Sequence, residues 1–229
     1  MHEQMHEEME HREIPFEFER KFFVEHLPEV ARKHGSQQFI VQSYVFAQGG
    51  YAIRVRLSFR DIAEFKFPKF DDSLDFMGAY ERKILARLLQ EFNREDSDAS
   101  VQATIAVKSP SINGERYEFE NELDLDVATQ ILQRSGNMVV KCRHSVWIGE
   151  DGWEFDVFAG QNNGLIVAEC ERLSPVVDLQ IPDFAVTEVT GDARFTNDAL
   201  SKEPWTQWDT QFKQELAARG PFFLDFRGA

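Results

Sequence analysis

The sequence predicts an α+β fold that is dominated by antiparallel β-strands. Two observations lead to this prediction. Polar and apolar residues alternate with a period of two in eight short runs, and turn-forming residues separate the runs. Amphipathic segments with helical periodicity are fewer, and they lie between or after these runs. About eight strands are enough to close a barrel around a small ligand.

The first predicted strand shows the pattern that the others repeat. Glu17, Glu19 and Lys21 lie on one face and phenylalanines on the other, because successive side chains of a strand point to opposite faces. The turn at Gly49-Gly50 is typical of a hairpin between the second and third strands. The eight predicted strands are Phe16–Phe22, Phe39–Phe46, Ile53–Leu57, Thr104–Lys108, Arg116–Glu120, Val139–Arg143, Trp153–Phe158 and Val167–Glu171.

Apolar stripes and helix start and stop signals predict four helices, over residues 27–34, 74–94, 125–134 and 205–219. The second carries the strongest stripe, which runs from Leu74 to Phe92. Packing against the strands is the favoured interpretation of this stripe, and a partner-binding helix is the alternative.

Composition excludes several classes of protein. The chain has 229 residues and a formal net charge of −15, so its surface should repel nucleic-acid backbones and general nucleic-acid binding is not expected. No apolar run approaches the roughly 20 residues that a membrane-spanning helix needs. The acidic first residues do not resemble a secretory signal, and Cys142 and Cys170 are too few for a disulfide framework. We therefore expect no membrane partner and a cytoplasmic location.

Charged side chains gather on one face of seven predicted strands, and their signs cluster strand by strand. Like charges two residues apart on a strand add no stability, which suggests a ligand. The acidic members are Glu17, Glu19, Glu118, Glu120, Asp156, Glu169 and Glu171. The basic members are Lys21, Arg54, Arg56, Lys108, Arg116, Lys141 and Arg143.

Alternation alone leaves two interpretations of this charged face open. It could be an ordinary solvated sheet surface, or it could line the interior of a closed barrel whose apolar outer face is covered by the helices. Enclosed charges cost several kcal/mol per ion unless they are compensated, so a charged interior implies a ligand of matching charge. Such carboxylates suit hard divalent cations, Mg²⁺ or Mn²⁺, since no Cys or His shares the face. Arginine and lysine at this density suit phosphate oxygens.

The order of these charged motifs resembles that of the CYTH superfamily, the triphosphate tunnel metalloenzymes, over about residues 16–200. The first strand resembles the E-x-E-x-K opening of the family, and Arg54–Leu57 resembles its R-x-R-L strand. Further similar segments are Gln42–Tyr44 (Q-x-Y), Thr104–Lys108 (T-I-K), Arg116–Glu120 (R-x-E-x-E), Lys141–Arg143 (K-x-R), Trp153–Phe158 (W-x-x-D-x-F), Gly164–Glu171 (G-L-x-x-A-E-x-E) and Glu188–Asn197 (E-V-T-x-D-x-R-x-x-N). Two departures concern the substrate entrance: residues 58–100 are longer than usual, and Ser-Pro follows Lys108 where glycine is common.

The resemblance implies a closed, antiparallel, eight-stranded β-barrel with a charged interior, and helices packed outside. It implies that metals bind the seven acidic residues and that the seven basic residues bind phosphate. On this basis we expect a flexible, acidic, histidine-containing tail at 1–13, a tunnel domain at 14–201 with a helical insertion at about 58–100, and a helical extension at 202–229. The closing E-V-T segment is similar to that of short bacterial inorganic triphosphatases, so we expect metal-dependent hydrolysis of inorganic triphosphate or of a small organic triphosphate.

Two lysines are the predicted catalytic residues. Lys21 shares its face with Glu17 and Glu19, which favour its charged form, so we expect it to stabilise phosphate or the leaving group. Lys141 has Arg143 two residues away, which disfavours its charged form and fits deprotonation of water. An adenylyl cyclase of the same superfamily and a non-catalytic polyphosphate- or nucleotide-binding module remain alternatives, and a homodimer is compatible with the sequence.

Overall fold

The structure is a computed structural model that describes residues 16–62, 65–70, 78–112, 114–172, 174 and 176–225. The predicted tail at residues 1–13 lies outside these ranges, as do Leu74 and Met77 at the start of the second predicted helix. No helix within the described ranges is long and apolar enough to cross a membrane.

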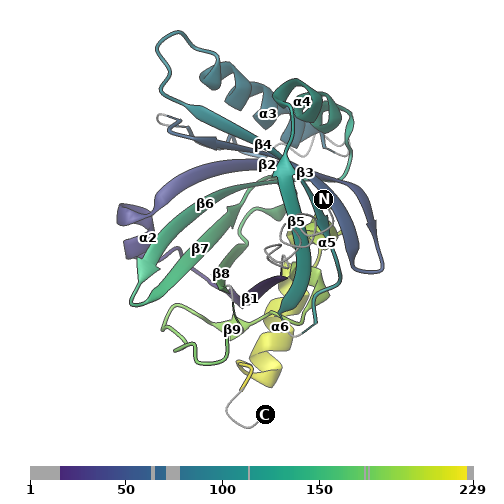
Figure 1. The fold of residues 1–229 in the computed structure, drawn as a ribbon. Coiled ribbons are helices and arrows are strands. Elements are labelled where there is room, and N and C mark those ends of the chain that lie inside the picture. The colour runs from purple at the N-terminus through teal and green to yellow at the C-terminus, as the bar shows by residue number, and fades with distance from the viewer. Residues whose placement is uncertain are drawn as a thin grey trace, which may run out of the picture.

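Eight antiparallel strands form a closed barrel, in the order β5-β4-β3-β2-β6-β7-β8-β1, and β1 pairs back to β5 (Figure 1). The ninth strand, β9, extends the sheet beside the end of β1. This confirms the predicted fold class. The strands are β1 (Phe16–Phe23), β2 (Ser36–Gln48), β3 (Tyr51–Arg60), β4 (Ser100–Lys108), β5 (Glu115–Glu122), β6 (Met138–Ile148), β7 (Asp151–Phe158), β8 (Ile166–Arg172) and β9 (Thr187–Glu188).

All four predicted helices have counterparts. The first three are α2 (Glu29–His34), α3 (Ala79–Phe92) and α4 (Leu125–Arg134). The fourth begins with a 3₁₀ turn at Trp205–Gln207 and continues as α6 (Asp209–Arg219). The start of α4 follows from its sequence, because the Asp124 side chain accepts a hydrogen bond from the Val127 amide and so caps the helix.

Helices α3 and α4 cover part of the barrel's outer surface, above β2, β3 and β4 (Figure 1). The apolar stripe of α3, with Ile84, Leu85 and Leu88, is buried in this core, which confirms that it packs against the strands. The cover is incomplete, however. On β5 the outward-facing Tyr117 and Phe119 remain 38% and 47% exposed.

A second apolar core fills one end of the barrel. Inward-facing Phe23 and Val167 pack there against Trp205 and Phe212 of the C-terminal segment. The short helix α5 (Asn197–Leu200) belongs to the same cover. Because this end is filled with buried apolar side chains, the charged interior is confined to the rest of the barrel.

Candidate functional site

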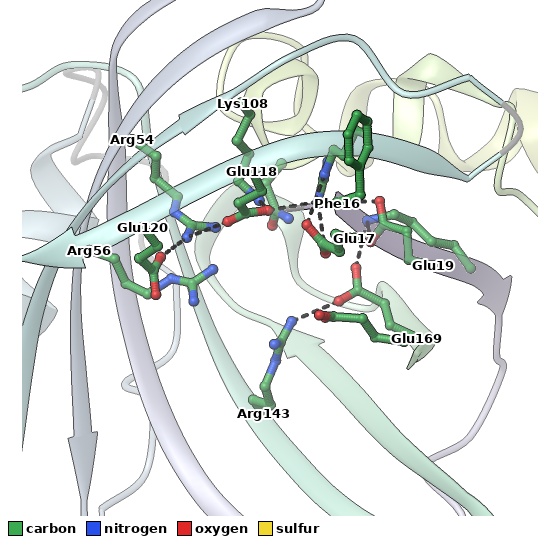
Figure 2. A pocket seen from close by; sticks show the side chains of 14 residues that line it. Phe16, Glu17, Glu19, Arg54, Arg56, Lys108, Glu118, Glu120, Arg143 and Glu169 are labelled. Atoms are coloured by element: carbon green, nitrogen blue, oxygen red, sulfur yellow. Dashed lines mark hydrogen bonds and ion pairs between the residues drawn. The ribbon is translucent and has the colours of Figure 1, made fainter. Parts of the chain in front are cut away.

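The charged faces of the strands converge on one cavity of about 320 Å³ inside the barrel (Figure 2). Six acidic and six basic side chains line it, and all twelve were predicted from the sequence. The acidic ones are Glu17, Glu19, Glu118, Glu120, Glu169 and Glu171, and the basic ones are Lys21, Arg54, Arg56, Lys108, Arg116 and Arg143. The interior interpretation of the charged face is therefore correct, and the solvated-sheet interpretation is wrong.

Strand register determines the depth at which each side chain lies. Lys21 is paired with Glu169, and Glu169 with Glu154, so these three form one ring of the wall. One ring closer to the apolar end, the paired positions are Phe23 and Val167. Rings on the same strand are two residues apart, which is about 6.6 Å. On β1 and β8 the interior thus changes from charged to apolar over one ring, whereas on β7 the residue paired with Val167 is the buried Asp156.

On one side of the cavity, the arginine of β5 organises the glutamates of the first strand. Arg116 lies 3.1 Å from Glu17, 3.3 Å from Glu19 and 3.5 Å from Glu118. Glu118 also forms ion pairs with Arg54, at 3.2 Å, and with Lys108. The carboxylates of β1 and β5 are therefore held together by cations from β3, β4 and β5.

On the opposite side, Arg143 of β6 bridges three carboxylates. It lies 2.7 Å from Asp156 and 2.8 Å from Glu169, and it also pairs with Glu154. Glu169 in turn lies 2.7 Å from Lys21. The two halves of the network meet at Lys21, which also lies 3.0 Å from Glu19.

The two predicted catalytic lysines have opposite electrostatic environments. Burial alone would lower the pKa of Lys21, but the carboxylates of Glu169 and Glu19 outweigh it and raise the pKa above its ordinary value. For Lys141, burial dominates and lowers the pKa to about 8; Asp156 opposes this shift and Arg143 adds to it. The direction of each shift agrees with the sequence argument, although burial is the larger cause for Lys141.

Lys141 and Asp156 do not line the cavity. Both side chains are buried behind Arg143, where the Lys141 ammonium group donates hydrogen bonds to Asp156 and to the Asn197 side chain. Their inward orientation follows from alternation, but their depth depends on the register of β6 with β7. Catalytic and metal-binding roles for these two residues stay predictions.

Two charged side chains at the cavity form no ion pair or hydrogen bond within the described part of the chain. One is Arg56, whose pKa burial lowers to about 10, helped by the nearby Arg54 and Arg143. The other is Glu171, which lies at the cavity's mouth with a raised pKa, owing to its partial removal from water and to the carboxylates of Glu17 and Glu154. An unpaired cation and an unpaired anion are thus available to a ligand.

Sequence reasoning missed two polar residues at the site. Asn197 lines the cavity although it comes from α5 and not from a strand, so alternation could not reveal it. Glu154 shares the inward face with Asp156 and pairs with Arg143; alternation placed it on that face, and it could have been included.

A divalent metal fits this site by the chemistry of its donors. Its oxygen ligands would come from carboxylates, which Mg²⁺ and Mn²⁺ prefer. Within the described ranges no three His, Cys, Asp or Glu side chains form a ready-made cluster for a metal, because most carboxylates contact lysine or arginine. Glu171 is the exception, since its charge is uncompensated and the neighbouring carboxylates disfavour it. A cation at the mouth would stabilise the charged form of Glu171.

A closed eight-stranded antiparallel barrel whose interior cavity is lined by paired acids and bases defines a class of enzymes that act on anionic phosphate chains in a tunnel. Comparison with known proteins narrows this class. The chain is 33% identical, over 119 residues, to an inorganic triphosphatase of Acetivibrio thermocellus, a match that covers 48% of this chain and 76% of that protein. The chain therefore belongs to the CYTH superfamily of triphosphate tunnel metalloenzymes.

Solved structures of similar proteins are more distant in sequence. The crystal structure of the inorganic triphosphatase NE1496 is 21% identical and has a TM-score of 0.47, over 81% of this chain and 93% of that one. A conserved protein from Pyrococcus furiosus is 14% identical and has a TM-score of 0.40, over 70% of this chain and 80% of that one. No family model matches the chain.

Proposed function

We propose that this protein is a divalent-metal-dependent triphosphatase, which hydrolyses inorganic triphosphate or a small organic triphosphate inside the barrel. Its membership in the superfamily supports this activity. The observation that carries the proposal is the matched set of six acidic and six basic side chains around one cavity inside the barrel. Mg²⁺ or Mn²⁺ is the proposed metal.

Charge balance supports binding of metal and phosphate together. The cavity is neutral when its lining side chains carry their ordinary charges. A triphosphate brings several negative charges into this enclosed space, and burying them uncompensated costs several kcal/mol per charge. Divalent cations bound together with the phosphate chain would restore the balance. The lysines and arginines of the wall would then hold phosphate oxygens, and its carboxylates would hold the metals.

Arg56 is the proposed first contact for phosphate, because its guanidinium group has no carboxylate to leave. Arg54 and Lys108 lie on the neighbouring wall and would exchange Glu118 for phosphate oxygens. Lys21 and Arg143 would hold the phosphate chain from the opposite side. Basic side chains on both walls would hold the phosphate chain in one orientation. Positioning and charge neutralisation together supply most of the catalysis in phosphoryl transfer.

The seven predicted acidic residues would hold the metals, with Glu17, Glu19 and Asp156 proposed for the second metal. A bound divalent metal supplies charge neutralisation and an acidified water at this position. Lys21 keeps its proton at every physiological pH, so it stabilises negative charge on the phosphate. Lys141, with its pKa near 8, is the proposed base for the attacking water.

A phosphate-release screen tests this function. Purified protein is incubated with inorganic triphosphate, ATP, thiamine triphosphate or pyrophosphate, each with Mg²⁺, with Mn²⁺ or with excess chelator. We expect phosphate release from at least one triphosphate with metal, and none with chelator. Cyclic AMP from ATP without phosphate release would instead identify a cyclase, and tight binding of a triphosphate without turnover would identify a binding module.

The domain boundaries, the oligomeric state and the location are further proposals. We propose a tunnel domain at 14–201, with an insertion at about 58–100 that contributes α3, and an extension at 202–229 that contributes α6. A homodimer and a cytoplasmic location remain predictions from the sequence. Size-exclusion chromatography with light scattering tests the first of these, and cell fractionation tests the second.

A further inference from the structure

Glu81 is a buried carboxylate that lies outside the tunnel. It belongs to the first turn of α3 and is only 9% exposed. The other buried residues of this helix are Tyr80, Ile84, Leu85 and Leu88, whose contacts hold α3 against the barrel. A carboxylate adds nothing to such an apolar contact, because removing its charge from water is unfavourable. Packing therefore does not account for Glu81.

No cation of the chain compensates this carboxylate. Within the described ranges Glu81 forms no ion pair and no hydrogen bond with another side chain. Burial raises the pKa of the Glu81 carboxyl above its ordinary value, and only its own backbone amide and the charge of Arg82 oppose this shift. The Arg82 guanidinium group is itself occupied, since it donates a hydrogen bond to the Ser135 carbonyl at 2.7 Å. The charge of Glu81 is thus available to a cation from solution.

Glu81 faces a cavity of about 220 Å³, which we call the side cavity. The start of α3, the α4–β6 connection, the 3₁₀ turn at Gly160–Asn162 and the segment after α5 form its walls. Position 160 has a φ of +68°, and a Cβ atom there would lie 3.0 Å from the Oε1 atom of Glu81, so glycine leaves room for the carboxylate. A water molecule takes up about 30 Å³ in the liquid, so the side cavity has room for a hydrated ion or a small organic cation.

Neutral oxygen atoms line the rest of the side cavity. The amide side chains of Gln161 and Gln207 are among its lining groups, and neither forms a hydrogen bond within the described part of the chain. The Ser201 hydroxyl group donates to the Asp198 carbonyl at 2.7 Å, so its oxygen can still accept a hydrogen bond or bind an ion. One carboxylate and several uncharged oxygens are therefore available together.

Two further polar residues of the side cavity are already engaged. Asn162 donates to the Leu200 carbonyl at 3.1 Å and accepts from the Trp205 amide at 2.8 Å. The Lys202 ammonium group lies 3.5 Å from the carboxylate of Asp198 and pairs with it. Asn162 thus shapes the wall of the side cavity, and Lys202 directs its charge to a partner other than Glu81.

We propose that the side cavity binds a monovalent cation, either K⁺ or the ammonium group of a small amine. One carboxylate balances a single positive charge, and the amide and hydroxyl oxygens replace water around the ion. A divalent metal generally requires more carboxylates, and no three acidic, His or Cys side chains cluster within the described ranges. The net charge of −15 raises the concentration of cations around the whole protein.

A cation at this position would join α3 to the C-terminal cover of the barrel. Leu200 and Ser201 line the side cavity, and they lie at the end of α5 and directly after it. The first residue of the same helix, Asn197, lines the tunnel cavity and accepts a hydrogen bond from Lys141 at 3.3 Å. Occupancy of the side cavity should therefore stabilise the fold. The inference does not depend on the proposed hydrolysis.

Thermal unfolding of the full chain at pH 8 tests this site. Wild-type protein is titrated with potassium chloride, methylammonium chloride or tetramethylammonium chloride, at one constant total chloride concentration. Tetramethylammonium has no N–H group, and its methyl groups keep its charge away from the oxygens, so it controls for ionic strength. The variant Glu81→Gln keeps the shape of the side chain and removes its charge. The matched control is Glu91→Gln, because Glu91 lies in the last turn of α3, where it pairs with Arg94 at 3.2 Å.

We expect K⁺ or methylammonium to raise the melting temperature of the wild type by about 2–4 °C relative to tetramethylammonium, at about five times the dissociation constant. The more effective of the two identifies a metal ion or an amine as the source. Glu91→Gln should keep the whole shift and Glu81→Gln should lose it. In tetramethylammonium, Glu81→Gln should melt no lower than the wild type, since it buries no uncompensated charge.

A second variant covers the case in which Glu81→Gln does not fold. Gln161→Leu keeps the carboxylate and removes one amide oxygen, so it should weaken the apparent affinity for the cation by about fivefold. Equal melting temperatures of the wild type in all three salts would overturn the site. So would a full shift in Glu81→Gln or, if that variant does not fold, an unaltered affinity in Gln161→Leu.

Discussion

The ammonium group of Lys141 donates a hydrogen bond to the carboxylate of Asp156, and both side chains are completely shielded from solvent. Removing one partner of a buried ion pair leaves the other charge uncompensated. We therefore expect Lys141→Met to lower the free energy of unfolding by about 3–5 kcal/mol. Arg143, which also contacts Asp156, should keep the loss toward the lower end of this range.

Chemical denaturation at pH 7 measures this loss. The control is Lys202→Met, because Lys202 forms an exposed pair with Asp198 at 3.5 Å and should contribute less than about 1 kcal/mol. Equal losses for the two variants would contradict a structural role for the buried pair.

The two lysines should differ in their effect on the pH dependence of hydrolysis. A base acts in its neutral form, and the pKa of Lys141 is lowered to about 8, so the wild-type rate should rise as the pH increases through 8. We expect Lys141→Ala to lose this rise and to slow turnover at least a hundredfold, roughly the contribution of a general base. Lys21→Ala should slow turnover at every pH, because Lys21 stays charged.

Rate against pH from 6 to 10 provides the measurement for both lysine variants, with circular dichroism as the check on folding. If both variants retain near wild-type turnover, the assignment of the two lysines fails.

Arg56 should contribute to ligand binding and not to stability. Its guanidinium group is partly buried and unpaired, so Arg56→Gln removes a charge that the fold does not compensate. We expect the melting temperature of the free protein to stay the same or to rise. Hydrogen bonds to charged groups contribute about 1.5–3 kcal/mol, so KM for triphosphate should rise roughly tenfold or more.

Thermal unfolding with and without inorganic triphosphate and Mg²⁺ separates the two effects of Arg56. The ligand should stabilise the wild type far more than it stabilises Arg56→Gln. Arg56→Lys is the matched control, since it keeps the charge but not the planar fork of the guanidinium group. A large drop in the melting temperature of free Arg56→Gln would show that the arginine is structural.

Alternation predicted the faces of the strands well, because one face of every strand must be enclosed and side chains change face with each residue. It therefore identified the twelve charged residues that line the cavity. Depth along the barrel could not be predicted in the same way. Whether Lys141 lies at the cavity or behind it depends on how β6 is aligned with β2 and β7, and that register is a property of the closed sheet.

Alternation within strands also could not predict site residues that come from other parts of the chain. Asn197 reaches the cavity because the chain folds back after β9 and places α5 against the apolar end. The ends of the strands were a separate difficulty: Trp147 points to the same face as Lys141 and Arg143, but the predicted strand ended at Arg143. The strand extends to Ile148 because β6 and β7 remain paired up to the turn, with Trp147 opposite Gly152.

Glu171 should link metal binding to stability. Its pKa in the folded protein is raised above the unfolded value of about 4.5, so the folded state holds the proton more tightly and loses stability as the pH rises above 4.5. Removing the charge with Glu171→Gln should therefore raise the melting temperature of the metal-free protein at pH 8.5 and have little effect at pH 4.5. The same variant should weaken binding of Mn²⁺ or Mg²⁺ by tenfold or more.

Scanning calorimetry with chelator, followed by calorimetric titration with Mn²⁺, measures both effects of Glu171→Gln. Glu203→Gln, at the exposed residue before Pro204, is the control and should leave both quantities unchanged. Unaltered metal affinity in Glu171→Gln would remove Glu171 from the metal site.

The contribution of Glu169 to stability should depend on pH in the opposite direction to that of Glu171. Burial disfavours its ionised form, but Lys21 and Arg143 outweigh burial and hold its pKa well below the ordinary value. A carboxylate with a lowered folded pKa contributes stability in full above its unfolded pKa, about 4.5, and loses that contribution as the pH falls below it. We expect Glu169→Gln to be clearly less stable than the wild type at pH 7, and the difference to shrink steadily from pH 5 to pH 3.

Urea unfolding of metal-free protein across this range measures the difference. Glu29→Gln, in the exposed pair with Lys33, is the control and should cost less than about 1 kcal/mol at pH 7. A difference between Glu169→Gln and wild type that stays constant from pH 7 to pH 3 would mean that Glu169 acts by packing and not through its charge.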